Sequence, residues 1–236
     1  MSLYTGVDIG IKNLAICIID PEQWGRYRDD PDEIDPGIKL WKNINLLDEA
    51  KKCDGVTKKG ASCGKLAKWS SKKDHFCGMH KHSDCKEYKQ PRVKGTPLKE
   101  FKRRMFIELD KIDLFNDVKY IAVETQPRFN QQMKMFAASL ESYFIIRQLV
   151  DRDRKNGIQM CNSPAKNKLM VYDGPHISTG HIRDQYACRK FLAQKHVEYF
   201  LERCPLVLDE FYTNESKKDD LADAFLHCIS AIHKKY

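Results

Sequence analysis

The sequence lacks the features that mark membrane proteins and exported proteins. Its 236 residues contain no apolar run long enough to cross a bilayer, which takes about 20 residues in a helix, and its longest apolar runs have the length of β-strands. The N-terminus lacks a basic segment followed by an apolar run, so no secretory signal is expected. The chain also has no internal repeat and no low-complexity tail. These absences predict an intracellular protein with no membrane partner.

Cysteine is present in a number and a distribution that argue against a disulfide framework. The nine cysteines are odd in number, and four lie in apolar surroundings typical of reduced residues in an intracellular core: Cys17, Cys161, Cys188 and Cys228. A hydrophobic fraction of 42% supports a normal core, and the length fits one α/β domain with an insertion. The 41 Lys and Arg against 33 Asp and Glu give a formal charge of +8, which favours a polyanionic partner.

The apolar patterns predict a mixed sheet flanked by helices. Residues 6–20 hold two apolar runs around a short polar segment, which is the pattern of a β-hairpin with buried strands. Residues 21–36 are acidic and turn-rich, which predicts a surface loop, and residues 38–47 alternate as a third strand. Further along we expect helices over 96–113, 132–154, 184–203 and 218–234, strands over 119–124 and 157–161, a loop over 211–215, and a loop or short helix over 164–182. This order predicts an α/β fold whose sheet is antiparallel at first and parallel later.

Acidic residues stand at positions where burial makes them costly. Asp8 interrupts the first strand, and Glu124 ends the strand before residue 125. Asp220 and Asp223 lie three residues apart on the last helix and therefore share a face. If the strands are neighbours and the helix packs over their ends, the four carboxylates converge and repel each other unless cations are present. Hard oxygen ligands predict Mg²⁺ or Mn²⁺, in a pair able to hydrolyse a phosphodiester.

Each acid also has a plain structural explanation. Asp8 would serve equally as a capping or salt-bridged residue of the turn, and Asp220 and Asp223 would offset the dipole of their helix. The order of the acids along the chain is what favours the metal site: an Asp in the first strand, a Glu ending a middle strand, and an Asp-x-x-Asp on the final helix.

Residues 51–90 differ in composition from the rest of the chain, being rich in Lys, Gly, Cys and His and poor in aliphatic residues. Such a segment cannot fill a core and needs a covalent or metal staple. A tetrahedral zinc site of Cys53, Cys63, Cys77 and His80 is predicted, with His75, His82 and Cys85 as alternative ligands. The structural alternative is a flexible basic loop with incidental cysteines. We therefore expect a zinc module at 49–91, inserted into a domain formed by 1–48 and 92–236. The lysines of the module would extend a surface that binds a polyanionic partner.

Three short motifs resemble those of a known family. They are Val7-Asp8-Ile9-Gly10, Val123-Glu124-Thr125-Gln126 and Asp220-Leu221-Ala222-Asp223-Ala224. In order and spacing they resemble the catalytic motifs of RuvC-like Holliday junction resolvases of the ribonuclease H-like superfamily. The runs 6–19 and 121–128 are most similar to the resolvases of poxviruses and other large DNA viruses. The resemblance covers residues 1–47 and the chain from about residue 96 onward, and the insertion departs from it.

The resemblance implies a ribonuclease H-like fold and an endonuclease that nicks opposing strands of four-way DNA junctions. Asp8, Glu124, Asp220 and Asp223 would hold two Mg²⁺ or Mn²⁺ ions, with Asp219 as an alternative to Asp220. The segment 163–168 is similar to a family loop whose functional lysine would here be Lys168, with Lys166 second; an ordinary solvated lysine is the plain alternative. Basic residues expected along the DNA path, each of which is also typical surface charge, are Lys12, Arg128, Lys134, Lys166, Arg183 and Lys190.

Symmetric cutting of a junction needs two active sites related by a two-fold axis, which predicts a homodimer with the helix 132–154 as its interface. Recognition would rely on backbone shape and charge, so binding should weaken with salt. A viral protein of this kind would act in the cytoplasm or nucleus of the host cell. Two other functions stay open: another ribonuclease H-like nuclease, related to RNA-processing enzymes or transposases, and an inactive zinc-containing nucleic-acid-binding protein.

Overall fold

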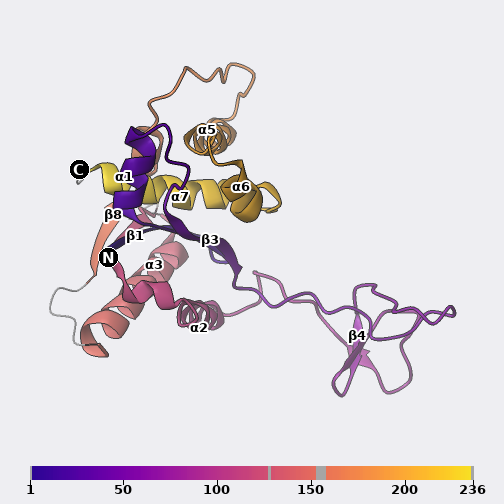
Figure 1. Ribbon diagram of the computed structural model, residues 1–236. Coiled ribbons are helices and arrows are strands. Elements are labelled where there is room, and N and C mark those ends of the chain that lie inside the picture. Colours follow the sequence, from indigo (N-terminus) through magenta and orange to yellow (C-terminus); the bar gives the residue numbers. More distant parts are fainter. Residues whose placement is uncertain (1, 127–128, 153–157, 235–236) are drawn as a thin grey trace. The chain divides into compact units, whose positions relative to one another are not determined.

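The computed structural model describes residues 2–126, 129–152 and 158–234. Internal contacts divide the chain into two compact units, one formed by Met1–Leu46 and Phe101–Tyr236 and the other by Leu47–Glu100. The second unit therefore extends beyond the predicted insertion of 49–91 at both ends. Each unit contains its own β-sheet (Figure 1).

The first unit is built on a five-stranded mixed sheet in the order β3-β2-β1-β7-β8. The strands β1, β2 and β3 pair antiparallel, whereas β7 is parallel to β1 and β8 is parallel to β7. This order and these directions are those of the ribonuclease H-like sheet, so the predicted fold class is confirmed. The bounds are Leu3–Ile9 for β1, Asn13–Ile19 for β2, Ile38–Asn45 for β3, Val118–Glu124 for β7 and Gln159–Ser163 for β8.

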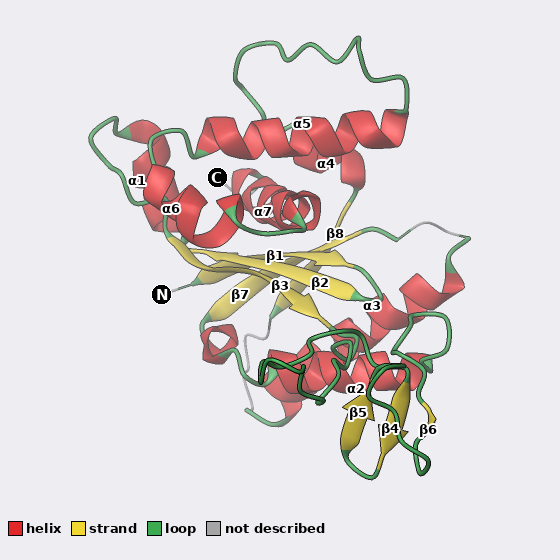
Figure 2. Ribbon diagram, turned by 90° about the vertical axis from the view of Figure 1, so that its right-hand side faces the viewer, coloured by secondary structure: helices red, strands yellow, loops and turns green. Residues whose placement is uncertain are grey.

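Helices cover both faces of this sheet (Figure 2). On one face α7, Lys218–His233, lies directly against β1 and β2, and α5, Gln185–Phe200, packs on α7. The core on this side is rich in aromatic residues, among which Trp24, Trp41 and Phe225 are fully buried. On the other face lies α3, Gln131–Phe144, whose Phe136, Leu140 and Phe144 are buried at helical spacing; α2, Leu98–Leu109, precedes β7.

Gly6 sets the distance between α7 and the central strand. A Cβ atom at this position would overlap the carbonyl oxygen of Ala224 and the backbone nitrogen of Cys228. Because both are backbone atoms, the helix could admit a side chain only by moving away from β1. The absence of a side chain at Gly6 therefore brings the acidic face of α7 next to the strand that carries Asp8.

The segment 21–36 is not the surface loop that its composition predicted. Its first part forms α1, Pro21–Asp29, which buries Trp24 and Tyr27. The carboxylate of Asp20 accepts hydrogen bonds from the backbone nitrogens of Glu22 and Gln23, at 3.1 and 3.4 Å, and so caps the helix. The aspartate–proline start and the aromatic pair three residues apart were the helix signals, and the surrounding acidic residues obscured them.

Two other boundaries differ from the prediction. The long helix expected over 132–154 changes from α-helix to a π-helical segment, Ile145–Val150, and its expected last residues lie outside the described part of the chain. The loop expected over 211–215 is largely helical, since α6, Pro205–Leu208, continues into a π-helical turn, Asp209–Thr213. The remaining short elements are a 3₁₀ turn, Asp113–Asn116, and α4, Ala165–Leu169. None of the helices in the described ranges is both long and apolar enough to span a membrane.

The second unit has little apolar core. Its sheet has the order β5-β4-β6, with β4 at Trp69–Ser71, β5 at Asp74–Phe76 and β6 at Lys86–Glu87. The structure describes every residue of Leu47–Glu100. The buried apolar residues of this range are Cys53, Ala67 and Cys77. This amount of burial is far below what offsets the chain entropy of a folded segment of this length, so the unit needs another source of stability.

Candidate active site and metal centre

Three elements bring acidic side chains to one edge of the large sheet. Asp8 is next to the last residue of β1, and Val7 pairs in register with Val123 of β7, so Glu124 follows at the same edge. The α7 helix, packed against β1, carries Asp223 beside them: the negative charges of Glu124 and Asp223 both act on Asp8. The arrangement of β1, β7 and α7 thus places Asp8, Glu124 and Asp223 at one edge of the sheet.

Lys168 lies among these carboxylates. It belongs to α4, which follows β8, and its side chain is buried. Its Nζ is 2.7 Å from Oδ2 of Asp223 and 3.9 Å from Oε1 of Glu124. One ammonium group therefore lies between two carboxylates that come from a helix and a strand far apart in the sequence.

The charge of Lys168 does not fully compensate the acids. Burial, followed by the negative charges of Glu124 and Asp223, raises the pKa of Asp8 well above its usual value. Burial also raises the pKa of Asp223 to about 6 despite the nearby ammonium of Lys168. The second carboxylate oxygen of Asp223, Oδ1, is buried and has no hydrogen-bond partner among the described residues. An additional cation would satisfy both the excess charge and this oxygen, which is the property expected of a site for a hard divalent ion.

The carboxylates are nevertheless spaced more widely than a closed metal site. Within the described ranges, the Cys/His group of the second unit is the one set of three or more Asp, Glu, Cys or His side chains whose ligand atoms all lie within 4.8 Å. The acid cluster therefore has the composition and the unsatisfied charge of a metal site, with Lys168 between two of its members.

Asp219 and Asp220 occupy different surroundings. Asp219 forms an ion pair with Lys190 of α5, which lowers the pKa of Asp219 although burial opposes the shift. Asp220 has its Oδ1 3.8 Å from the same ammonium, and burial followed by the charge of Asp219 raises its pKa. Asn13, at the start of β2, lies near Asp220 and acts against this rise in its pKa. Asp219 is thus neutralised by Lys190 of α5, whereas Asp220 lies near Asn13, the first residue of β2.

Sequence reasoning missed a buried polar pair beside Lys168. His227 lies one helical turn after Asp223, and its Nδ1 is 2.8 Å from Oγ of Ser163, the last residue of β8. Burial, aided by the charge of Lys168, lowers the pKa of His227 to about 3, so the ring is neutral. Its Nε2 is buried without a partner in the described part of the chain. The four-residue spacing from Asp223 was the available signal.

The residues expected along a DNA path lie in several settings. A cavity of about 290 Å³ beside Glu124 is lined by Thr125, Gln126, Lys134 and Asn162, among others, so Lys134 is close to the acid cluster. Lys190 is engaged with Asp219, as described above. Lys12, Lys166 and Arg183 have exposed side chains, and Arg128 lies outside the described residues.

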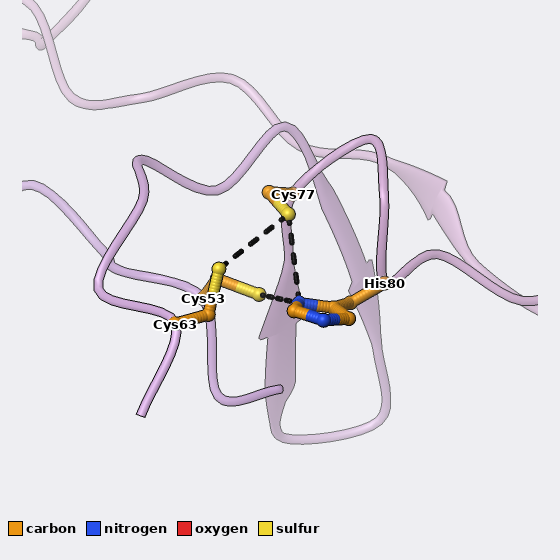
Figure 3. Close-up of side chains that lie close together, drawn as sticks. All are labelled: Cys53, Cys63, Cys77 and His80. Atoms are coloured by element: carbon orange, nitrogen blue, oxygen red, sulfur yellow. Dashed lines mark hydrogen bonds between the residues drawn. The ribbon is translucent and has the colours of Figure 1, made fainter. Parts of the chain in front are cut away.

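The second unit brings Cys53, Cys63, Cys77 and His80 together (Figure 3). Nδ1 of His80 is 3.3 Å from Sγ of Cys53 and 3.7 Å from Sγ of Cys77, and Sγ of Cys63 is 3.9 Å from that of Cys77. Ligands at the usual zinc bond lengths stand about 3.5–3.8 Å apart in a tetrahedron. This Cys₃His group can therefore bind zinc, and the alternative ligands His75, His82 and Cys85 lie outside it.

Two features prepare this group for a metal ion. Burial opposes ionisation of the Cys77 thiol, but hydrogen bonds from the backbone N–H groups of Met79 and His80, together with those from the side chains of Cys53 and Cys63, outweigh it and lower the pKa of Cys77 to about 6. A Cβ atom on Gly55 would lie 2.5 Å from Cγ of His80, so only glycine leaves room for the imidazole there. The local backbone thus favours a thiolate at Cys77 and fixes the ring of His80.

Comparison with known proteins gives a viral relative at low identity. No protein-family model matches it. It is 28% identical over 213 residues to the uncharacterized protein L451 of Acanthamoeba polyphaga mimivirus, a match that covers 80% of this chain and 50% of that protein. The chain thus spans about half the length of this curated relative.

The solved structures to which it is similar include two proteins at low identity. The RuvC protein of Thermus thermophilus, in complex with a Holliday junction substrate, is 11% identical with a TM-score of 0.49, over 100% of this chain and 96% of that one. The yeast mitochondrial Holliday junction resolvase Ydc2 is 16% identical with a TM-score of 0.47, over 98% of this chain and 82% of that one.

Proposed function

We propose that this protein is a divalent-metal-dependent endonuclease that resolves four-way DNA junctions by nicking opposing strands. The observation that carries the proposal is the incomplete neutralisation of the acids: Asp8 has a strongly raised pKa, and Asp223 keeps a buried oxygen that has no hydrogen-bond partner in the described ranges. A carboxylate cluster at the edge of a ribonuclease H-like sheet has this character when it is built to receive cations. The junction as substrate follows from the motif resemblance.

In the proposed mechanism, Asp8, Glu124, Asp220 and Asp223 provide the ligands. Two Mg²⁺ or Mn²⁺ ions, when bound, would activate water and stabilise the leaving oxygen of a phosphodiester. We assign the fourth ligand to Asp220 because Lys190 already neutralises Asp219. The ammonium of Lys168 would hold Glu124 and Asp223 in position and offset negative charge near the phosphate. Neutral His227, bonded to Ser163, would fix the end of β8 that leads into the lysine loop.

A substrate panel tests the reaction. With Mg²⁺, the protein should cut a synthetic four-way junction by paired nicks in opposing strands, and should cut a linear duplex of the same sequence much more slowly. A flap and an RNA–DNA hybrid complete the panel. Faster cutting of the hybrid or the flap would instead support another ribonuclease H-like nuclease, and junction binding without any cutting would support an inactive binding protein.

We also propose that the protein acts as a homodimer, with the π-helical segment that follows α3 as its interface. The π-helical segment after α3 exposes four large apolar side chains: Ile145, Ile146, Leu149 and Val150, with exposed fractions of 42–69%. Such a patch on one segment is typical of an interface and is unfavourable in water. Two copies joined here by a two-fold axis would supply the two active sites that paired nicks require.

Charged substitutions test this interface. The double variant Ile146→Glu/Leu149→Glu should weaken dimerisation at least about tenfold, because burying one unpaired carboxylate costs more than 1.4 kcal/mol. Analytical ultracentrifugation over a concentration series measures the change. Ile107→Glu, which alters a similarly exposed residue on α2, is the matched control and should leave the dimer unchanged. A wild-type protein that stays monomeric at high concentration would contradict the proposal.

A further inference from the structure

The second unit carries almost the entire net charge of the chain. Residues 47–100 contain 14 Lys and Arg against 7 Asp and Glu, a net charge of +7, whereas the whole chain has +8. The larger unit is therefore close to neutral overall. A dense positive charge confined to a small unit indicates that the unit itself contacts a polyanion.

Four of these cations line a groove. A cavity of about 920 Å³ lies between β4, the end of β6 and the segment that follows it up to Thr96. Its lining includes Lys68, Lys89, Arg92 and Lys94, all with exposed side chains, and a single acid, Glu87. The groove thus presents four cations against one anion, which matches the charge of a phosphodiester backbone.

Two aromatic side chains also line the groove, and both are half-buried. They are Trp69 of β4 and Tyr88, which follows β6. The ammonium of Lys81 lies 4.3 Å from the centre of the Trp69 ring, and the ring of Tyr88 meets His75 edge to face. Both rings line the groove, and neither belongs to the small set of buried apolar residues of this unit. Their π surfaces are suited to stacking on nucleobases.

The side chain of Gln90 fixes one wall of the groove, because it links its own segment of the backbone to two others. The amide nitrogen of Gln90 donates to the carbonyl oxygens of Lys51 and Ala67, both at 2.7 Å, and its amide oxygen accepts from the backbone nitrogen of Lys51 at 2.9 Å. Because Gln90 uses both ends of its amide in this way, the segment that carries Lys89 and Arg92 is held in place. A groove fixed in advance loses less entropy when it binds a ligand.

We propose that this groove binds an unpaired DNA strand, with its cations on the backbone and its aromatic side chains on the bases. A paired duplex offers phosphates but keeps its bases stacked inside, so it would use the charges and not the rings. A single strand uses both. The choice of DNA over RNA rests on the proposed function, and the binding itself does not require the acid cluster of the larger unit.

Fluorescence anisotropy of the whole 236-residue chain, loaded with zinc, with labelled oligo(dT) tests the proposal. No Mg²⁺ is added, so a failure of binding is distinguishable from a failure of cleavage. Replacing Lys89, Arg92 and Lys94 together by Ala should weaken binding at least about tenfold and reduce the salt slope by about 2, at about 0.7 per contact. The matched control replaces Lys58, Lys59 and Lys73 by Ala. It removes the same charge from outside the groove and should change the affinity much less.

A second variant tests stacking without changing the charge. Tyr88→Leu should weaken oligo(dT) binding at least about fivefold. This factor corresponds to the lower end of the binding free energy that one base gains by stacking on an aromatic ring. The same variant should bind a duplex as tightly as the wild type does. Equal losses in the groove and control triple variants would overturn the proposal, since they would indicate diffuse attraction. Tighter binding of duplex, or of oligo(U) over oligo(dT), would also overturn it. Measured zinc content of each variant verifies that the unit is intact.

Discussion

Replacing Asp8 by Asn, or Glu124 by Gln, should reduce Mg²⁺-dependent cleavage of a four-way junction by about 100-fold or more. Each change removes one negative charge from a cluster in which burial and mutual repulsion raise the pKa of Asp8. The site would then attract divalent cations less strongly, and a ligand oxygen would be lost. Single-turnover cleavage, measured over a range of Mg²⁺ concentrations, separates weaker ion binding from slower chemistry.

The melting temperatures of the same variants, measured with and without Mg²⁺, distinguish loss of function from loss of fold. Without divalent ions, Asp8→Asn should have an unchanged or higher Tm, because the amide removes a charge that the folded protein holds at a cost. The rise in Tm that Mg²⁺ produces in the wild type should be smaller in the variant. Asp32→Asn, in an exposed loop, is the matched control and should behave as the wild type in both measurements. Full cleavage by either Asp8→Asn or Glu124→Gln would remove the metal assignment.

Removing zinc should unfold residues 47–100 while the larger unit stays folded. The small unit buries only three apolar residues, and structural zinc contributes about 10–16 kcal/mol in small zinc-binding domains at neutral pH. Cys77→Ser replaces a thiolate ligand by a hydroxyl group that binds zinc poorly, so it should have the same effect as a chelator. Limited proteolysis followed by mass spectrometry should place the new cleavage sites within this unit.

A matched cysteine checks the ligand set. Cys85 lies near His82 but outside the Cys₃His group, so Cys85→Ser should keep its zinc and resist proteolysis. Zinc content measured on the purified proteins should be one ion per chain for the wild type and for Cys85→Ser, and none for Cys77→Ser. Loss of zinc from Cys85→Ser together with retention in Cys77→Ser would show that the ligands are wrongly assigned.

The large sheet could be predicted because its signals are local. Apolar runs mark β1 and β2, and the parallel pairing of β1 with β7 follows from the alternation of strands and helices later in the chain. The edge where Asp8 and Glu124 meet is a direct consequence of this pairing, since parallel strands end on the same side. The Cys₃His group was also readable, because its residues are close in sequence and few arrangements could stabilise so polar a segment.

The rest depends on packing between distant segments. Nothing in the sequence around α4 fixes the direction of Lys168; its place among the acids results from the packing of α4 against α7. The burial of His227 and its bond to Ser163 likewise require two elements more than 60 residues apart in sequence. The α1 helix was missed for a local reason: acidic residues and prolines favoured a loop, whereas burial of Trp24 and Tyr27 decided the structure.

The position of Lys168 has a consequence for how the protein matures. Docking α7 onto the sheet gathers negative side chains into a region poor in water, and this step would oppose itself electrostatically if no positive group were present. Because Lys168 is part of the chain itself, its ammonium group can pair with these carboxylates during folding without divalent ions from the solution. Under the proposed function, folding and ion loading would be separate events, and a newly made chain would reach its native structure before it binds the ions that it needs to cut DNA.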